Sequence, residues 1–224
     1  MAERPVEVLV DGAAVARRGA GLIAERARAA VAERGRFALA VSGGRTPWVM
    51  FAEFAGHDVP WHAVTIYQVD ERIAEDGDPD RNLTHLEESL PEAALQRLVP
   101  MPVTEADVDA AAAAYAESLP ERLDLVHLGL GDDGHTASLV PGDPVLGVAD
   151  RDVALTGEYK GRRRMTLTYP ALDRAGEILW LVTGAEKAVP LAKLLAGDES
   201  IPAGRVRAAH ALVLADEAAT TGRP

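Results

Sequence analysis

Two kinds of segment alternate along this chain. The first kind is short and almost wholly apolar or alternating, as expected of strands within a sheet. These segments lie at 6–10, 37–41, 64–69, 123–128, 153–155, 165–168, 177–182 and 211–214. The second kind carries apolar residues at helical spacing. It predicts helices over 11–33 (capped by Asp11), 48–54, 83–98, 104–119 and 185–196. This alternation predicts an α/β fold with a mainly parallel sheet flanked by helices.

Polar, charged or glycine-rich loops follow four of the predicted strands. They cover residues 42–47, 70–72, 131–138 and 183–187. The carboxyl ends of parallel strands share one edge of a sheet, so these loops are expected to converge on one cleft. The sequence therefore predicts a ligand or active site at that edge.

The loop 131–138 contains the most informative group, in which His135 follows two aspartates, Asp132 and Asp133. A carboxylate can orient the imidazole, which can then take a proton from water near pH 7. The alternative is a tight turn whose aspartates cap a following helix.

The loop 42–47 follows a buried strand and opens a helix. Gly43 and Gly44 let backbone amides approach a ligand, while Ser42 and Thr46 supply hydroxyls. Together with the positive end of the helix, this predicts a phosphate site. The spacing is neither that of a P-loop nor that of a dinucleotide-binding fingerprint. The alternative is an ordinary strand–helix turn.

Charged residues accompany the other loops. Asp70 and Arg72 directly follow a strand, where they can bind sugar hydroxyls or stabilise an oxyanion, or else form a structural ion pair. Arg164 and Lys187 begin a strand and a helix and can reach a phosphate, although exposure on the surface is the commoner fate of such residues. His127 lies within a strand and is expected to be packed rather than catalytic.

Composition narrows the classes of function. The length of 224 residues and the apolar content of 48% suit one domain, expected to span 1–224. The net charge of −12 argues against a nucleic acid partner. No segment approaches the ~20 apolar residues of a membrane span, and residues 1–5 lack an apolar signal core. The absence of cysteine excludes disulfides and thiolate chemistry and fits a cytoplasmic protein.

Together, these loops resemble the 6-phosphogluconolactonases, within a wider family that includes the glucosamine-6-phosphate deaminases. The segments that carry the resemblance are 41–47, 69–72, 80–82, 129–142, 164–168 and 184–188. It implies a Rossmann-like open α/β sandwich of the deaminase type. It also implies hydrolysis of 6-phospho-D-glucono-1,5-lactone to 6-phosphogluconate in the pentose phosphate pathway, with no metal or organic cofactor. The expected partner is that phosphorylated sugar lactone, with no nucleic acid or membrane, and the expected state is a monomer or weak homodimer.

The resemblance also implies roles for single residues. His135 matches the general base and Asp133 its orienting partner, while Asp70 and Arg72 match positions that face the sugar ring. These four form the expected catalytic set. The positions that match the phosphate site are Ser42, Gly43, Gly44, Thr46, Arg164 and Lys187.

Departures from the family pattern and two alternatives remain. Arg45 stands where a small residue is common, Val140 where phenylalanine is common, and His127 in a strand that is usually aliphatic. One alternative is a glucosamine-6-phosphate deaminase–isomerase, but Leu139 and Val140 occupy the positions of its usual Asn-Glu pair. The other is a sugar-phosphate-binding module without turnover.

Overall fold

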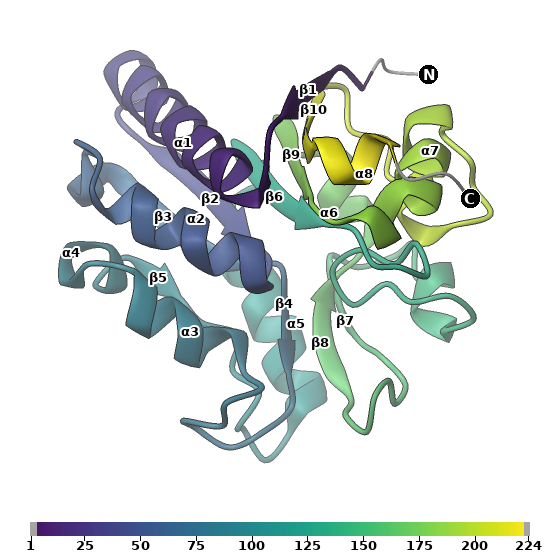
Figure 1. Cartoon of the computed structure of the whole chain (residues 1–224). Coiled ribbons are helices and arrows are strands. Elements are labelled where there is room, and N and C mark those ends of the chain that lie inside the picture. Colours follow the sequence, from purple (N-terminus) through teal and green to yellow (C-terminus); the bar gives the residue numbers. More distant parts are fainter. Residues whose placement is uncertain (1–3, 222–224) are drawn as a thin grey trace.

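Seven parallel strands form the central sheet of this computed structural model, which describes residues 4–221 (Figure 1). The strand order is β1-β10-β9-β6-β2-β3-β5, and every neighbouring pair is parallel. The strands are β1 (Val6–Leu9), β2 (Phe37–Val41), β3 (Val64–Gln68), β5 (Leu98–Val99), β6 (Leu125–Gly129), β9 (Glu177–Val182) and β10 (Ala211–Asp216). The expected α/β class with a mainly parallel sheet is confirmed. Two predictions concern residues that lie in part outside the described range. These are the single domain over 1–224 and the absence of an apolar signal core in residues 1–5.

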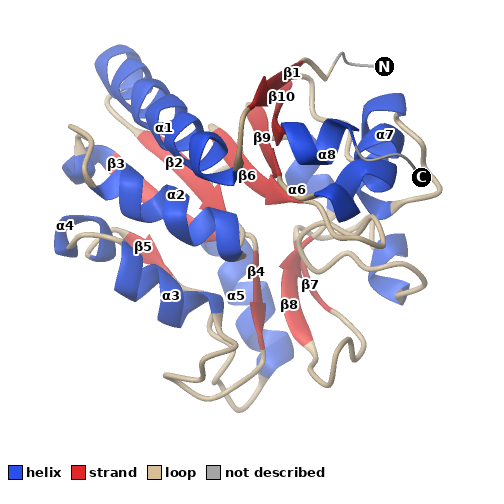
Figure 2. Ribbon diagram, in the orientation of Figure 1, coloured by secondary structure: helices blue, strands red, loops and turns tan. Residues whose placement is uncertain are grey.

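Helices cover both faces of this sheet (Figure 2). Those with apolar residues in one core are α1 (Gly12–Arg34), α2 (Arg45–Ala55), α3 (Asn82–Ser89) and α4 (Glu92–Leu95). Those with apolar residues in the other core are α5 (Val108–Ser118), α6 (Tyr169–Asp173), α7 (Ala188–Ala196) and α8 (Glu217–Thr221). Within residues 4–221, no helix combines the length and apolarity needed to cross a membrane.

The strands are apolar on both faces because each face packs against a core. In β9, Ile178, Trp180 and Val182 belong to one core, and Leu179 and Leu181 belong to the other. This follows from the two-residue repeat of a strand, whose side chains point to opposite faces in turn. It explains why the strand segments are nearly continuous apolar runs.

The strand order reverses direction between β2 and β6. From β2 the chain adds β3 and β5 on one side, and from β6 it adds β9 and β10 on the other. In open α/β sheets, a crevice forms outside the carboxyl ends of the two strands at which the order reverses. The loops that follow β2 and β6 are 42–47 and 131–138, so the topology brings together the two most informative motifs of the sequence.

A second, antiparallel sheet was not predicted. It has the order β4-β8-β7, from β4 (Asp70–Arg72), β7 (Val153–Leu155) and β8 (Arg164–Leu167). Residues 70–72 were predicted as a loop, but they pair with β8, Arg72 opposite Arg164 and Asp70 opposite Thr166. This pairing brings the charged groups of two distant segments to neighbouring positions.

The predicted helix 83–98 is wrong in its second half. Pro91 lacks an N–H and restricts Leu90 to an extended backbone, with φ −99° and ψ 149°. The segment therefore divides into α3 and α4, and Leu98–Val99 forms the edge strand β5, which pairs with Ile66 and Tyr67. The predicted N-cap of α1 is confirmed, since Asp11 Oδ1 accepts from Ala14 N at 2.7 Å.

Candidate active site

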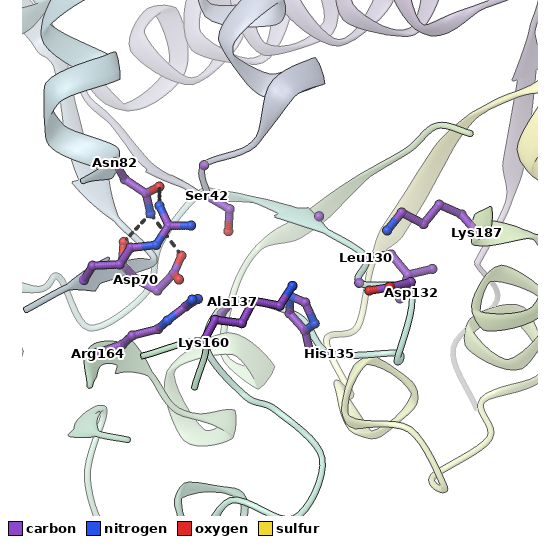
Figure 3. A pocket seen from close by; sticks show the side chains of 14 residues that line it. Ser42, Asp70, Asn82, Leu130, Asp132, His135, Ala137, Lys160, Arg164 and Lys187 are labelled. Atoms are coloured by element: carbon purple, nitrogen blue, oxygen red, sulfur yellow. Dashed lines mark hydrogen bonds between the residues drawn. The ribbon is translucent and has the colours of Figure 1, made fainter. Parts of the chain in front are cut away.

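A pocket of about 240 Å³ lies where the loops after β2 and β6 meet the small sheet. Figure 3 shows the side chains that line it. The lining residues are Ser42, Gly43, Asp70, Arg72, Asn82, Gly129, Leu130, Gly131, Asp132, His135, Ala137, Lys160, Arg164 and Lys187. Seven predicted site residues are among them: Ser42, Gly43, Asp70, Arg72, His135, Arg164 and Lys187. The predicted convergence of the four loops is therefore found in the fold.

His135 and Asp133 form a hydrogen-bonded pair at the wall of this pocket. Asp133 Oδ1 lies 2.5 Å from His135 Nδ1 and accepts from His135 N at 3.0 Å. Asp133 does not itself line the pocket, whereas His135 does. Because the carboxylate engages Nδ1, Nε2 is the ring nitrogen left to exchange a proton with water. The pair thus has the arrangement of a base and its orienting carboxylate.

Two glycines make the turn around this pair possible. A Cβ at Gly131 would lie 2.0 Å from His135 Nδ1, and Gly134 adopts φ +81° with Ile201 packed against it. The alternative in which the aspartates cap a following helix is wrong. An irregular segment follows the turn, and the next helical turn, Pro144–Gly147, is capped by Asp143.

The pKa of Asp133 lies below its usual value. Burial of the carboxyl acts in the opposite direction and raises the pKa. Hydrogen bonds from the backbone and ring of His135 and from the hydroxyl of Tyr159, with the charge of His135, outweigh burial and lower it. Asp133 is therefore ionised at neutral pH, as an orienting carboxylate must be.

The loop after β2 presents a buried hydroxyl to the pocket. Ser42 N donates to His127 Nδ1 at 3.3 Å, while Ser42 Oγ is buried and has no hydrogen-bond partner within residues 4–221. A buried hydroxyl without a partner is costly, which favours a ligand that supplies one. Gly44, with φ +138°, is the N-cap of α2 and has no side-chain cap bond. The amides at this helix end therefore lack a side-chain acceptor at the cap.

Gly44 and Thr46 line a second cavity instead. This cavity of about 190 Å³ shares Gly43 and Lys187 with the main pocket, and Arg45 also lines it. Thr46 Oγ1 lies 2.7 Å from Thr183 Oγ1. Two of the predicted phosphate-site residues therefore face the neighbouring compartment, at the point where the two cavities meet.

Arg72 is held by neutral oxygen atoms. Its Nη1 donates to Asn82 Oδ1 at 2.5 Å and to Asp80 O at 2.7 Å. Among residues 4–221, it has no carboxylate within 4.0 Å, so the structural ion pair suggested as an alternative is not formed. Its positive charge remains available to a ligand.

The fully buried carboxylate of Glu71 connects β4 to the start of α3. Glu71 accepts from the N–H groups of Arg72, Asn82 and Leu83 and from Gln68 Nε2, each at 2.8 Å. Two of those amides belong to the first turn of α3, where a negative charge is favoured. Glu71 thereby fixes Asn82, which in turn donates to Asp70 O at 2.8 Å and accepts from Arg72.

Arg164 is a buried cation at the edge of the pocket. The residue is 8% exposed, and its Nε has no hydrogen-bond partner among the described residues. Its Nη1 donates to Ser138 Oγ at 3.4 Å, and Ser138 Oγ donates to Asp70 Oδ2 at 2.6 Å. Burial lowers the pKa of Arg164 from its usual value, and the Asp70 carboxylate opposes that shift. An arginine with this environment favours an incoming anion.

Four cations therefore line one pocket: Arg72, Lys160, Arg164 and Lys187. In Figure 3, Arg164 lies beside Asp70 at one end and Lys187 at the other, with Ser42 and His135 between them. The net charge of −12 repels an anionic ligand from the chain as a whole, but these cations make the pocket locally favourable for one.

Sequence reasoning missed three residues of the site. Asn82 lies in the segment 80–82, which contributes to the family resemblance, but no role was predicted for this residue. Lys160 and Tyr159 lie in the turn between β7 and β8, where Gly157 and Gly161 are the turn signals. The expectation for His127 is confirmed: it is fully buried, and burial lowers its pKa to about 3.

Within residues 4–221, one group of three potential metal ligands has its ligand atoms all within 4.8 Å of one another. It consists of Asp132, Asp133 and His135. Asp133 Oδ1 is already engaged by the His135 ring, and both aspartates are exposed, where such groups are common without an ion. We assign no metal to them. The positions of the usual deaminase Asn-Glu pair hold Leu139 and Val140, which are buried and apolar.

Comparisons with known proteins identify a family and a shared fold. The family model of glucosamine-6-phosphate isomerases/6-phosphogluconolactonase matches residues 10–215. A 6-phosphogluconolactonase of Synechocystis sp. is 35% identical over 199 residues, which cover 82% of this chain and 75% of that protein. The crystal structure of a 6-phosphogluconolactonase from Thermotoga maritima has a TM-score of 0.86 and 25% identity, and covers 96% of this chain and 100% of that one.

A monomeric glucosamine-6-phosphate deaminase has a TM-score of 0.82 over 98% of this chain and 100% of its own, at 18% identity, which shows the fold alone. The expected open sandwich of the deaminase type is thereby confirmed. The match of the family model over residues 10–215 covers nearly the whole chain. The chain therefore belongs to the glucosamine-6-phosphate isomerase/6-phosphogluconolactonase family of enzymes.

Proposed function

We propose that this chain hydrolyses 6-phospho-D-glucono-1,5-lactone to 6-phospho-D-gluconate, with His135 as the general base that activates water. The observation that carries the proposal is the presence of a carboxylate-backed imidazole and four cations in one pocket. The first group suits proton transfer, and the second suits a phosphorylated substrate. The named activity of the relatives supports the same reaction.

The phosphate binds against the loop after β2, where the two cavities meet. Ser42 Oγ and the amides of this loop donate to it, while Arg164 and Lys187 approach from opposite ends of the pocket. Gly44 and Thr46 complete the compartment on the side of the second cavity. Binding at this point anchors the lactone carbonyl carbon near His135.

Hydrolysis then needs one proton relay. Neutral His135 takes a proton from water through Nε2 as the water oxygen attacks C1, and Asp133 stabilises the imidazolium that forms. Arg72, whose charge no carboxylate of the described chain neutralises, stabilises the tetrahedral oxyanion, and Asp70 faces the sugar ring. The bond from C1 to the ring oxygen breaks as His135 returns the proton to that oxygen.

The test is hydrolysis of freshly prepared lactone, measured against its spontaneous decay. We expect acid release far above the decay rate, with 6-phosphogluconate as the product. A parallel reaction with glucosamine 6-phosphate, followed by ammonia release, is expected to show no turnover. Ammonia release without lactone hydrolysis would establish the deaminase alternative. Binding of the lactone without any hydrolysis would establish the binding-module alternative.

A further inference from the structure

Tyr159 lies in the turn that joins β7 to β8, next to the pocket-lining residue Lys160. The turn is closed by two backbone hydrogen bonds, from Tyr159 N to Arg162 O at 3.0 Å and from Arg162 N to Tyr159 O at 3.3 Å. Lys160 occupies its tip with φ +52° and lines the pocket. The turn thus holds Tyr159 beside the residues assigned to proton transfer.

The Tyr159 hydroxyl completes the hydrogen bonding of the orienting carboxylate. It donates to Asp133 Oδ2 at 3.1 Å, while Asp133 Oδ1 engages His135. The Tyr159 ring meets the His135 ring edge-on, with centroids 5.7 Å apart and planes at 64°. Both oxygens of Asp133 are therefore engaged, and the imidazole has a packed neighbour on the side of the β7–β8 turn.

The same ring also contacts a phosphate-site cation. The Arg164 guanidinium carbon lies 5.1 Å from the Tyr159 ring centroid, within the range of a cation–π interaction. Arg164 Nε has no hydrogen-bond partner among residues 4–221, and Nη1 makes only a long bond of 3.4 Å to Ser138 Oγ, so the ring adds a second contact that orients this guanidinium. Lys160 Nζ lies 5.2 Å from the same centroid.

We propose that Tyr159 is a positioning residue that fixes the Asp133–His135 pair through its hydroxyl and Arg164 through its ring. This inference rests on the proposed function, because it names what orients the base and the phosphate ligand. Tyr159 links these two parts of the site, which come from the loop after β6 and from β8. Losing the hydroxyl leaves Asp133 held through Oδ1 alone, by the ring and backbone N–H of His135, so the carboxylate is less firmly fixed. Losing the ring also frees Arg164.

The two parts of the side chain have separable kinetic effects. Tyr159→Phe removes one hydrogen bond to a charged group at a partly exposed residue. It is expected to lower kcat about tenfold with KM unchanged within twofold. Tyr159→Leu is expected to lower kcat equally and to raise KM about fivefold, because the Arg164 contact is lost as well. Tyr169→Phe is the matched control, since its hydroxyl donates to Pro202 O at 3.0 Å outside the pocket.

The pH profile separates positioning from a merely structural role. Without the hydroxyl, Asp133 carries more of its negative charge toward His135, so the protonated ring is favoured. The acid limb of the kcat/KM profile is then expected to move to higher pH in Tyr159→Phe. The other charged groups at the pocket near the ring are Asp132, Lys160, Arg164 and Lys187, which the substitution leaves in place. Tyr169→Phe is expected to keep the wild-type profile.

The inference is tested apart from the proposed function by observing His135 directly. The imidazole NMR signal of His135, assigned with His135→Asn, is titrated in the wild-type protein and in Tyr159→Phe without substrate. A midpoint that moves to higher pH supports the inference even if no lactone is hydrolysed. An unmoved midpoint, or a Tyr159→Phe enzyme with the wild-type kcat and pH profile, overturns it. If Tyr159→Leu does not fold, the results for Tyr159→Phe alone decide whether the inference holds.

Discussion

Asn82 occupies the space that any side chain at position 43 would need: a Cβ at Gly43 would lie 2.0 Å from Asn82 Oδ1 and 2.9 Å from the Trp48 ring. The same Oδ1 accepts from Arg72, so Gly43→Ala displaces the oxygen that holds the guanidinium. We expect kcat/KM for the lactone to fall at least ~10-fold, the effect of losing one hydrogen bond to a charged group. Steady-state kinetics on freshly prepared lactone measure it. Gly147→Ala is the control, because nothing lies within 4 Å of a Cβ there, and its kinetics are expected to be unchanged.

Replacement of the proposed base tests the proton relay. In His135→Ala the pocket keeps its cations and loses the imidazole, so kcat is expected to fall about 10²- to 10⁴-fold, with KM changed no more than a few-fold. Initial rates corrected for spontaneous decay measure both constants. His62→Ala removes an exposed histidine of the Trp61–Ala63 turn and is expected to retain wild-type rates. A kcat near the wild-type value in His135→Ala would remove the residue from this role.

The contribution of Lys187 to phosphate binding is separable from chemistry. Lys187→Ala removes one charge-assisted contact and is expected to raise KM about 10- to 100-fold, with a smaller effect on kcat. Lys193→Ala is the matched control, because this half-exposed lysine of α7 pairs with Asp198 and Ser200 outside the pocket. The lactone saturation curves of the two variants give the comparison. Equal KM values would exclude Lys187 as a phosphate ligand.

Buried His127 makes stability depend on pH. Its pKa is about 3 in the folded protein, against an ordinary value of 6.5 for a histidine in the unfolded chain, so between these values the unfolded chain binds a proton that the folded chain excludes. Stability is complete above pH 6.5 and falls by about 1.4 kcal/mol for each unit of acidification. In His127→Leu this contribution is absent, so the free energy of unfolding is expected to decline less steeply. Urea denaturation at pH 7.0, 5.5 and 4.5 measures both slopes, and parallel slopes would contradict the prediction.

The main sheet could be predicted because burial on both faces leaves a strong pattern in the sequence. β2 is apolar at every position and buried at every position, and the same holds nearly throughout β9. The segment Asp70–Arg72 carries no apolar residue, so its strand character follows only from its pairing with β8. α3 and α4 were predicted as one helix because helical spacing continues across Pro91.

The candidate site was predictable where residues follow a strand end. His135, Ser42 and Arg72 follow strands whose carboxyl ends meet, so topology alone brings them together. Lys160 lines the pocket and Tyr159 contacts His135 from the turn of the β7–β8 hairpin, whose orientation depends on tertiary pairing. Thr46 likewise contacts Thr183, which is distant in the sequence, and no local sequence pattern predicts such a contact. The roles of all these residues, the cytoplasmic location and the oligomeric state stay predictions.

The small sheet has a consequence for the order in which this enzyme becomes competent during synthesis. β4 emerges from the ribosome early, but its partner β8 and the cation at its start follow only after most of the chain is made. Until then, the glycine loop and the imidazole lack the wall that closes the substrate compartment. Contacts between such distant segments form late and slow the folding of a chain. We therefore expect no turnover from incomplete chains that lack β8, so that the site is completed only during the last third of translation.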